Sequence, residues 1–431
     1  MQKSEKGKRK KAFKKFLPFT FFLLSFIASL LGLAGCLSSL LGNVPTPAPK
    51  TPIATVSPVR NPSISMSSSV VNLELLQQSW EAYRQRFIQA DGRVIDREDS
   101  DRSTSEAQAY ALLRAVFMND STTFAKTLAW GENNLQRKAV GLRADQLWVW
   151  KWGRDPKGNW GIIDRNFASD ADIDATTALI LASRRWKSPQ YLSLAKAKLQ
   201  DLWNLSTVAV PEGRRYLLPG PREAFQTQPT RLLLNPSYFA PYAFRLFAQV
   251  DPAHNWLSLV DSSYQVLENS SGLSAVGLPS DWVSLDTQTG VFQALPASSP
   301  LQTEYGFNAY RIWWRMSLDA AWFKEPLATS FMRQHLRHLE QLWHTKSQIP
   351  ARIDLQGQPL VDYEATSQYA MLYAALRLLD PAAAEQILRR KLMPQYRNGF
   401  WDNESAYYTQ NLAWFGLLPP TTIAFQLLQP N

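Results

Sequence analysis

Residues 167–186 read FASDADIDATTALILASRRW, and this stretch carries the strongest information on the fold. Three aspartates, Asp170, Asp172 and Asp174, lie within five residues and lead into an apolar run that continues to Trp186. A carboxylate near a helix N-terminus caps the helix or offsets its dipole, which accounts for one of the three. The stretch therefore predicts a helix that follows a non-helical lead-in, and Asp170 and Asp172 in that lead-in are expected to bind a ligand.

The three/four spacing of apolar residues recurs along the chain and predicts about a dozen helices in all. It is clearest from Ala109 to Phe117, from Met332 to Trp343 and from Tyr369 to Leu379. The other helical segments lie near 73–89, 122–137, 173–186, 190–203, 237–249, 253–268, 307–319, 381–391 and 404–415. Strand-like alternation is expected only in one hairpin, Trp282–Leu285 with Val291–Ala294.

So many helices without a linker between them must share one core, so we expect an all-α fold. A closed double ring, with inner helices packed within outer ones, satisfies this and gathers its long loops into a cleft at one end. The chain holds 16 Trp and 15 Tyr, several of them in the loop-like stretches 148–153 and 158–161. Such rings stack on sugars, although half or more of them are equally well explained as packing residues.

The charge distribution argues against a nucleic-acid-binding protein. The 431 residues are 45% hydrophobic and 19% charged, with a net charge of +10. Residues 1–15 alone carry a net charge of +7, which leaves +3 for the rest of the chain. Because the body is nearly balanced, its charge predicts no nucleic-acid partner.

The basic head is followed by an apolar run, Phe16–Leu33, and then by Leu33-Ala34-Gly35-Cys36. This is the layout of a secretory signal, and the cysteine after Leu-Ala-Gly resembles a bacterial lipobox. We expect residues 1–35 to be a signal peptide and Cys36 to carry a lipid anchor, which places the protein outside the cytoplasm, in the periplasm or at the cell surface. The alternative is an uncleaved single-span anchor, since the run is about 18 residues long.

Cys36 is also the only cysteine, so an intramolecular disulfide framework is excluded. Residues 36–71 are rich in Pro, Ser and Thr and are expected to be a tether. We place the folded domain at 72–431.

The segment Ala168-Ser169-Asp170-Ala171-Asp172, with Ala178 and Trp186 at their spacing, resembles the signature of glycoside hydrolase family 8. Further blocks of the family are matched in the right order by Ser105–Tyr110, Asn235–Pro241, Pro279–Trp282, Tyr305–Arg315 and Tyr407–Gly416. The resemblance implies an (α/α)6 barrel that hydrolyses β-1,4-linked glucans, xylans or chitosan with inversion. It makes 72–431 a catalytic domain. We predict no cofactor, and no metal site, because histidines scattered on a helix face, as at His335, His338 and His344, are more often solvated surface than ligands.

The resemblance assigns the general acid to Glu106 and the carboxylate that holds the sugar to Asp172, with Asp170 in support. A glutamate at the start of an inner helix is partly desolvated, which keeps it protonated near neutral pH. The alternative is that Glu106 only completes a capping box with Ser103. The expected substrate-binding residues are Asp170, Tyr110, Gln108, Trp152, Trp160, Tyr238, Asn308, Arg311 and Tyr408.

The chain departs from the family at the general base. Asn308 stands where the main branch of the family has aspartate, and an amide cannot accept the proton. A second branch, which includes chitosanases, also has Asn there and takes its base from a glutamate a few residues upstream. Glu304 stands four residues before Asn308 and is our expected base, although it equally fits a cap of the helix expected from Phe307.

Three hypotheses about the function follow from these residues. The first is a lipid-anchored, inverting endo-β-1,4-glucanase that acts on a cellulose-like polymer at the cell surface. The second is a chitosanase, favoured by Asn308 with Glu304. The third is a catalytically impaired glycan-binding protein in an exopolysaccharide synthesis complex, favoured by Asn308 alone.

Overall fold

The computed structural model describes residues 68–139, 142–211, 213–226 and 228–429. The chain divides into two units, residues 1–73 and 74–431, and the second is the helical body described below. The expected signal segment, Cys36 and the tether as far as residue 67 lie outside the described residues. Among the residues that are described, no helix combines the length and apolar character that crossing a bilayer requires.

Six helices form a closed inner ring, because each packs on the next and the last packs on the first. In ring order they are α3 (Ser105–Phe117), α5 (Ser169–Trp186), α8 (Pro241–Val250), α10 (Tyr310–Phe323), α13 (Thr366–Leu379) and α15 (Tyr407–Leu417). They are buried on nearly every side, and α5 is buried without a break from Ser169 to Arg184. A helix with no polar face must lie inside the core, which explains why these six segments form the inner layer.

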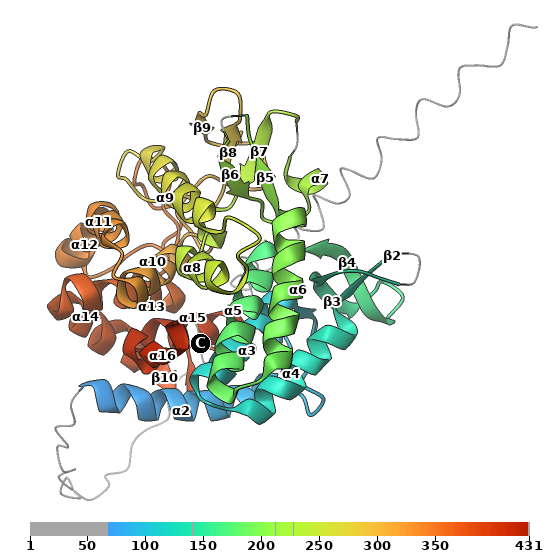
Figure 1. Cartoon of the computed structure of the whole chain (residues 1–431). Helices are drawn as coiled ribbons and strands as arrows, with labels where there is room; N and C mark the ends of the chain where they lie inside the picture. Colours follow the sequence, from blue (N-terminus) through green and yellow to red (C-terminus); the bar gives the residue numbers. More distant parts are fainter. Residues whose placement is uncertain (1–67, 140–141, 212, 227, 430–431) are drawn as a thin grey trace, which may run out of the picture. The chain divides into compact units, whose positions relative to one another are not determined.

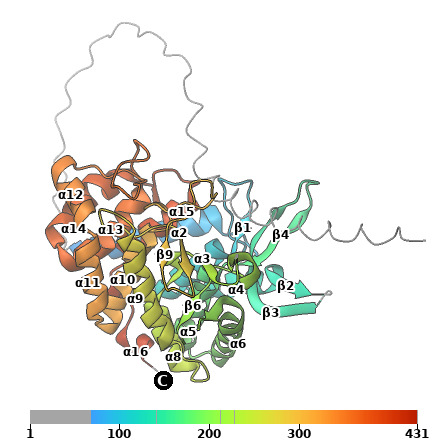
Figure 2. The ribbon, with the colours of Figure 1, turned by 90° about the horizontal axis from the view of Figure 1, so that it is seen from above.

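Most of the outer helices cover an inner neighbour (Figures 1 and 2): α4 lies on α3, α6 on α5, α9 on α8, α11 on α10 and α14 on α13. From α2, the carbonyl of Leu76 accepts a hydrogen bond from the indole of Trp414 in α15 at 3.0 Å. The outer helices are α2 (Ser68–Phe87), α4 (Ser121–Asn134), α6 (Pro189–Ser206), α9 (Leu257–Gly272), α11 (Pro326–His335), α12 (Arg337–Lys346) and α14 (Pro381–Ile387). The predicted (α/α)6 barrel is confirmed.

The strands are more extensive than the sequence predicted. A sheet holds β1 (Ser103–Thr104), β2 (Gln136–Ala139), β3 (Leu142–Arg154) and β4 (Trp160–Phe167), and β3 pairs with the other three strands. The stretches 148–153 and 158–161, expected as loops, thus largely belong to β3 and β4. Their hairpin projects at the right of Figures 1 and 2.

The predicted hairpin near Trp282 is confirmed as β8 (Val283–Asp286) and β9 (Phe292–Gln293), and β7 (Arg231–Leu234) pairs with β8 as a third strand. Gly290 in its turn has a φ of +70°, a conformation that favours glycine. The remaining strands are β5 (Thr207–Ala209), β6 (Arg215–Leu217), β10 (Tyr396–Arg397) and β11 (Phe400–Trp401).

The single helix expected from Met332 to Trp343 is wrong, because the chain breaks at Leu336 into α11 and α12. The apolar spacing continues through the break since both helices place Met332, Leu336, Leu339 and Trp343 in the core. The short helical pieces are α7 (Arg222–Phe225), α16 (Phe425–Leu428), the 3₁₀ helices η1 (Pro236–Tyr238), η3 (Met393–Gln395) and η4 (Pro420–Thr422), and the π-helix η2 (Leu388–Leu392).

Candidate active site

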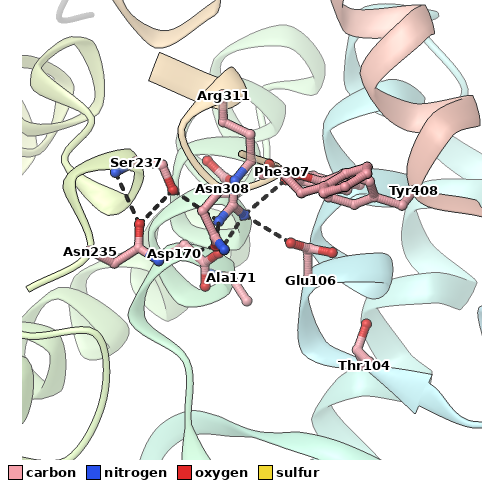
Figure 3. Close-up of polar contacts among 12 residues, drawn as sticks. Thr104, Glu106, Asp170, Ala171, Asn235, Ser237, Phe307, Asn308, Arg311 and Tyr408 are labelled. Atoms are coloured by element: carbon pink, nitrogen blue, oxygen red, sulfur yellow. Dashed lines mark hydrogen bonds and ion pairs between the residues drawn. The ribbon is translucent and has the colours of Figure 1, made fainter. Parts of the chain in front are cut away.

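The second residues of three inner helices meet at one end of the barrel (Figure 3). They are Glu106 of α3, Asp170 of α5 and Arg311 of α10. One guanidinium nitrogen, Nη1 of Arg311, donates to Glu106 Oε2 at 2.9 Å and to Asp170 Oδ2 at 2.8 Å. The positive end of a helix dipole favours a carboxylate in the first turn, so the parallel inner helices gather the two acids at this end. The two carboxylates therefore share one cation.

The other side of Arg311 is held by polar side chains from η1 and from the loop before α10. Its Nη2 donates to Ser237 Oγ and to Asn308 Oδ1, both at 3.0 Å. Asn235 links these two partners, since its Nδ2 donates to Asn308 Oδ1 at 3.1 Å and its Oδ1 accepts from Ser237 Oγ at 2.7 Å. Arg311 is only 2% exposed, so these contacts fix its orientation.

Glu106 has the properties of a proton donor. Its side chain is 20% exposed, and its second oxygen accepts a hydrogen bond from the Tyr407 hydroxyl at 2.9 Å. Burial raises the pKa of Glu106 to about 7, and the neighbouring charge of Asp170 acts in the same direction, while Arg311 and the Tyr407 hydrogen bond oppose the rise. A carboxyl that titrates near 7 is well matched to general acid catalysis at neutral pH.

The capping-box alternative for Glu106 does not match the structure. The N-cap of α3 is Thr104, whose hydroxyl accepts from the Ala107 amide at 3.1 Å. Ser103 instead donates its hydroxyl to the Val94 carbonyl at 2.6 Å. The Glu106 carboxylate is thus engaged by side chains of the cluster.

Asp172 lies apart from this cluster. It is fully buried, accepts from the Trp148 amide at 3.2 Å and has Lys198 Nζ at 3.9 Å. Burial raises its pKa to about 7 against the opposing charge of Lys198. Residues two apart on a helix point in nearly opposite directions, so α5 turns only Asp170 toward Glu106.

Gln108 is also outside the cluster and ties α3 to two backbone segments. Its amide nitrogen donates to the carbonyls of Gly92 and Thr127, each at 2.8 Å, and its oxygen accepts from the Val94 amide at 3.1 Å. It is fully buried, so these contacts place it in the packing of the barrel wall.

Two of the expected aromatic residues line Arg311. The Tyr110 hydroxyl lies 3.4 Å from Arg311 Nη1, and the ring centre of Tyr238 lies 5.2 Å from the guanidinium carbon. Tyr408, the second residue of α15, donates its hydroxyl to the Phe307 carbonyl at 2.7 Å. It therefore holds the loop that carries Asn308. Figure 3 shows Tyr408 beside Glu106.

Trp152 and Trp160 form a stack on the β3–β4 hairpin, with ring centres 5.2 Å apart. The guanidinium of Arg93 lies 4.5 and 4.4 Å from these ring centres. Trp152 pairs across the sheet with Ser103, three residues before Glu106, while Trp160 is 42% exposed. The stack thus extends from the start of α3, at Trp152, to the protein surface, at Trp160.

Asn308 stands on a loop that is held from behind by Asp281. The Asp281 carboxylate accepts from the amides of Gly306 at 3.1 Å and Ala309 at 2.7 Å. Burial raises the pKa of Asp281 to about 7, and Glu304 adds to the rise, while the hydrogen bonds from Ala309, Asn308 and Gly306 oppose it. A Cβ on Gly306 would lie 2.8 Å from Asp281 Oδ2, so the close approach requires glycine.

Glu304 lies on the same loop. Arg352 holds both its oxygens, with Nε at 2.6 Å and Nη2 at 2.9 Å. Since α10 begins at Tyr310, Glu304 does not cap that helix. A Cβ on Gly306 would lie 3.3 Å from Glu304 Oε1, so Glu304 and Asp281 flank the same point of the chain.

Four members of the site were present in the matched sequence blocks but were not predicted as site residues. They are Asn235, Ser237, Asp281 and Tyr407. Asn235 and Asp281 lie in loops, where small polar residues carry no periodic signal, while Ser237 lies in η1 and Tyr407 begins α15. Only the matched block around each of them marked the region.

The model of the glycosyl hydrolases family 8 matches residues 54–421, which is most of the chain. The chain belongs to glycosyl hydrolase family 8. The resemblance seen in the sequence motifs is thereby confirmed at the level of the family, and the cluster around Arg311 is the candidate active site of a family 8 protein.

Several of the relatives that match this chain bear the name endoglucanase. An endoglucanase of Xanthomonas axonopodis pv. citri (strain 306) is 36% identical over 257 residues, 59% of this chain and 62% of the relative. An endoglucanase of Escherichia coli (strain K12) is 27% identical, covering 78% of this chain and 85% of the relative. The crystal structure of an endo-1,4-D-glucanase from Vibrio fischeri ES114 superposes with a TM-score of 0.65 at 26% identity, covering 79% of this chain and 93% of the other.

Proposed function

We propose that this family 8 protein is an endo-β-1,4-glucanase that hydrolyses its substrate by inversion, with Glu106 as general acid. The observation that carries the proposal is a part-buried carboxyl, with its pKa raised to about 7, that shares Arg311 with a second carboxylate. The endoglucanases among the relatives support the reaction and the polymer class.

In this reaction Glu106 gives its proton to the glycosidic oxygen as the bond from that oxygen to the anomeric carbon breaks. The proton transfer prevents a negative charge from developing on the leaving sugar. Asp170 and Arg311 lie beside the reacting centre, where the Asp170 side chain, held by Arg311, stabilises the positive charge that develops on the sugar ring. Asp170 takes the role that the sequence had assigned to Asp172.

Inversion also needs a carboxylate on the opposite face of the sugar, about 6.5–9.5 Å from the acid, so that a water molecule fits between them. Asn308 cannot accept the proton of that water. We assign the base to Glu304, which Arg352 holds in place through both oxygens. Asp281 is the competing carboxylate because it flanks the same loop.

Asn308 favours one further candidate, a protein that binds glycan without cleaving it. Its Oδ1 already accepts hydrogen bonds from Asn235 and Arg311. Such a protein would retain the stack of Trp152 and Trp160 for binding and would fit a role in an exopolysaccharide synthesis complex. The chitosanase alternative rests on the same residue together with Glu304.

We place the enzyme outside the cytoplasm, held at a membrane by a lipid on Cys36, with a cellulose-like polymer as substrate. The support is the sequence Leu33-Ala34-Gly35-Cys36 after an apolar run and a basic head.

The experiment measures new reducing ends released by the full-length protein from carboxymethylcellulose, lichenan and chitosan. We expect release from the two glucans and none from chitosan, and Glu106→Gln is expected to abolish release while binding persists. Glu325→Gln is the matched control, because Glu325 is also a part-buried glutamate paired with an arginine, Arg245, but lies outside the cluster. Release by Glu106→Gln close to wild type would contradict the assignment. A wild-type protein that binds glucan without cleaving it would favour the glycan-binding candidate.

A further inference from the structure

A second ion pair lies one helical turn below Arg311. Helix α10 carries Arg311 and Arg315 four residues apart, and α5 carries Asp170 and Asp174 at the same spacing. Arg315 Nη1 and Nη2 reach the two oxygens of Asp174 at 2.9 and 3.1 Å. Residues four apart lie on one face of a helix, so the two helices are joined by two stacked Asp–Arg pairs.

The lower pair is buried in the interior of the barrel. Arg315 is fully buried and Asp174 is 1% exposed. Tyr242 of α8 completes a trio, since its hydroxyl accepts from Arg315 Nη1 at 3.1 Å and donates to Asp174 Oδ1 at 3.3 Å. Because α8 stands between α5 and α10 in the ring, the trio joins three consecutive inner helices.

The charges of the trio bear on the active site. The negative charge of Asp174 adds to the rise in the pKa of Glu106. Arg315 is bound to both oxygens of Asp174 and carries the opposite charge. Losing one partner would leave the other charge uncompensated in a medium that screens poorly.

We propose that Asp174, Arg315 and Tyr242 are positioning residues for the reaction: they fix α10 against α5 so that Arg311 lies between Glu106 and Asp170, and they do so without placing a net charge beneath the acid. The inference rests on the proposed role of Glu106. None of the three residues touches the sugar in this account, and each acts through Arg311 or through its field at Glu106.

Other charged and titratable groups face Glu106 and stay unchanged in the experiment. They are Tyr110 on α3, Asp170 on α5, Arg311 on α10, Tyr407 and Tyr408 on α15, Tyr238 on η1 and Tyr83 on α2.

The experiment compares the pH profile of kcat/KM in wild type and in Asp174→Asn, since its basic limb reports loss of the proton from the acid. Asn keeps a hydrogen-bond acceptor for Arg315 but leaves that cation unbalanced. The limb is expected to move to lower pH by about one unit. The double variant Asp174→Asn/Arg315→Met removes both charges, and its limb is expected at the wild-type position with a lower kcat.

Asp319→Asn is the matched control. Asp319 lies four residues further along α10 and forms the same kind of trio, with Arg245 Nε at 3.0 Å and the Tyr264 hydroxyl at 2.5 Å. It is not expected to move the limb. A merely structural role would lower the stability of both variants alike and leave both limbs in place.

An unmoved limb in Asp174→Asn, or an equal shift in Asp319→Asn, overturns the inference. If Asp174→Asn does not fold, Arg315→Gln replaces it in the test. This variant leaves the negative charge of Asp174 unbalanced, so the basic limb is expected to move to higher pH. A limb that stays in place or moves to lower pH then overturns the inference. A ¹³C titration of the Glu106 carboxyl, assigned with Glu106→Gln, reads the same shift without turnover. An active Glu106→Gln variant would instead contradict the proposed function. Failure of the inference and failure of the proposed function are therefore distinguishable.

Discussion

At the scale of single residues, the burial of Glu106 makes stability depend on pH. Its pKa in the folded protein is about 7, above the ordinary value of a glutamate, so folding favours the protonated form. The associated stability is complete below the unfolded pKa and is lost as pH rises through about 7. The side chain in Glu106→Gln does not titrate, so the variant does not lose this stability. We expect its free energy of unfolding, relative to that of wild type, to rise by about 2 kcal/mol between pH 5 and pH 8. Urea unfolding at both pH values measures this, and an equal difference at both would contradict it.

The base assignment is tested by chemical rescue. Glu304→Ala removes the carboxylate and leaves space beside Gly306, so turnover on glucan should fall by about 10²-fold or more. Added azide is expected to restore turnover and to yield a glycosyl azide of inverted configuration, because the anion attacks without needing a base. Asp281→Asn is the comparison. Rescue of Asp281→Asn alone would move the base to Asp281, and full activity of Glu304→Ala without azide would eliminate Glu304.

Sequence patterns predicted part of this cluster. Glu106, Asp170, Arg311 and Asn308 come together in the structure, and each of them stood in a recognisable block. Asp172 stood in the same block as Asp170, but the helical phase turns it toward Trp148. The sequence predicts which of the two aspartates faces the cluster only when one contact of the helix is already known. The partners supplied by distant segments, such as Tyr407, follow from closure of the ring, which no local pattern encodes.

At the scale of elements, the contact between α13 and α15 depends on Gly416. A Cβ there would lie 2.2 Å from the Ala370 carbonyl oxygen, so Gly416→Ala must push the two inner helices apart. We expect it to lower the free energy of unfolding by about 2 kcal/mol. The control is Gly272→Ala in α9, where a Cβ meets nothing within 4 Å and alanine favours the helix by up to about 1 kcal/mol. Denaturant unfolding of both variants checks the pair, and equal effects would contradict the packing argument.

The elements also explain which predictions from the sequence succeeded. Helices with an apolar repeat were predicted correctly because a helix that is buried on one face requires apolar residues at three/four spacing. β3 was missed because Leu147–Trp150 is buried on both faces and shows no alternation. The break at Leu336 was missed because both α11 and α12 pack on the same core, so the repeat continues across it.

At the scale of the whole molecule, the chain separates a charged head from a nearly neutral body. Most of the net positive charge, +7 of +10, lies in the first 15 residues. A near-neutral body suits a neutral glucan, whereas a cationic polymer such as chitosan would favour an acidic surface. The number of helices was enough to predict ring closure, because about twelve helices without a linker leave few other ways to share one core.

The division between head and body predicts that Cys36 decides where the protein is found. Acyl chains on this residue would hold the protein at a membrane through burial of their methylene groups, at about 0.8 kcal/mol for each. Cys36→Ser cannot be acylated, so we expect the protein to leave the membrane fraction or to stay as an unprocessed precursor of higher mass. Ser38→Ala, two residues further on, is the control and should fractionate like wild type. Fractionation and mass spectrometry of the N-terminus give the result, and a Cys36→Ser protein that stays membrane-bound at wild-type mass would refute the lipid anchor.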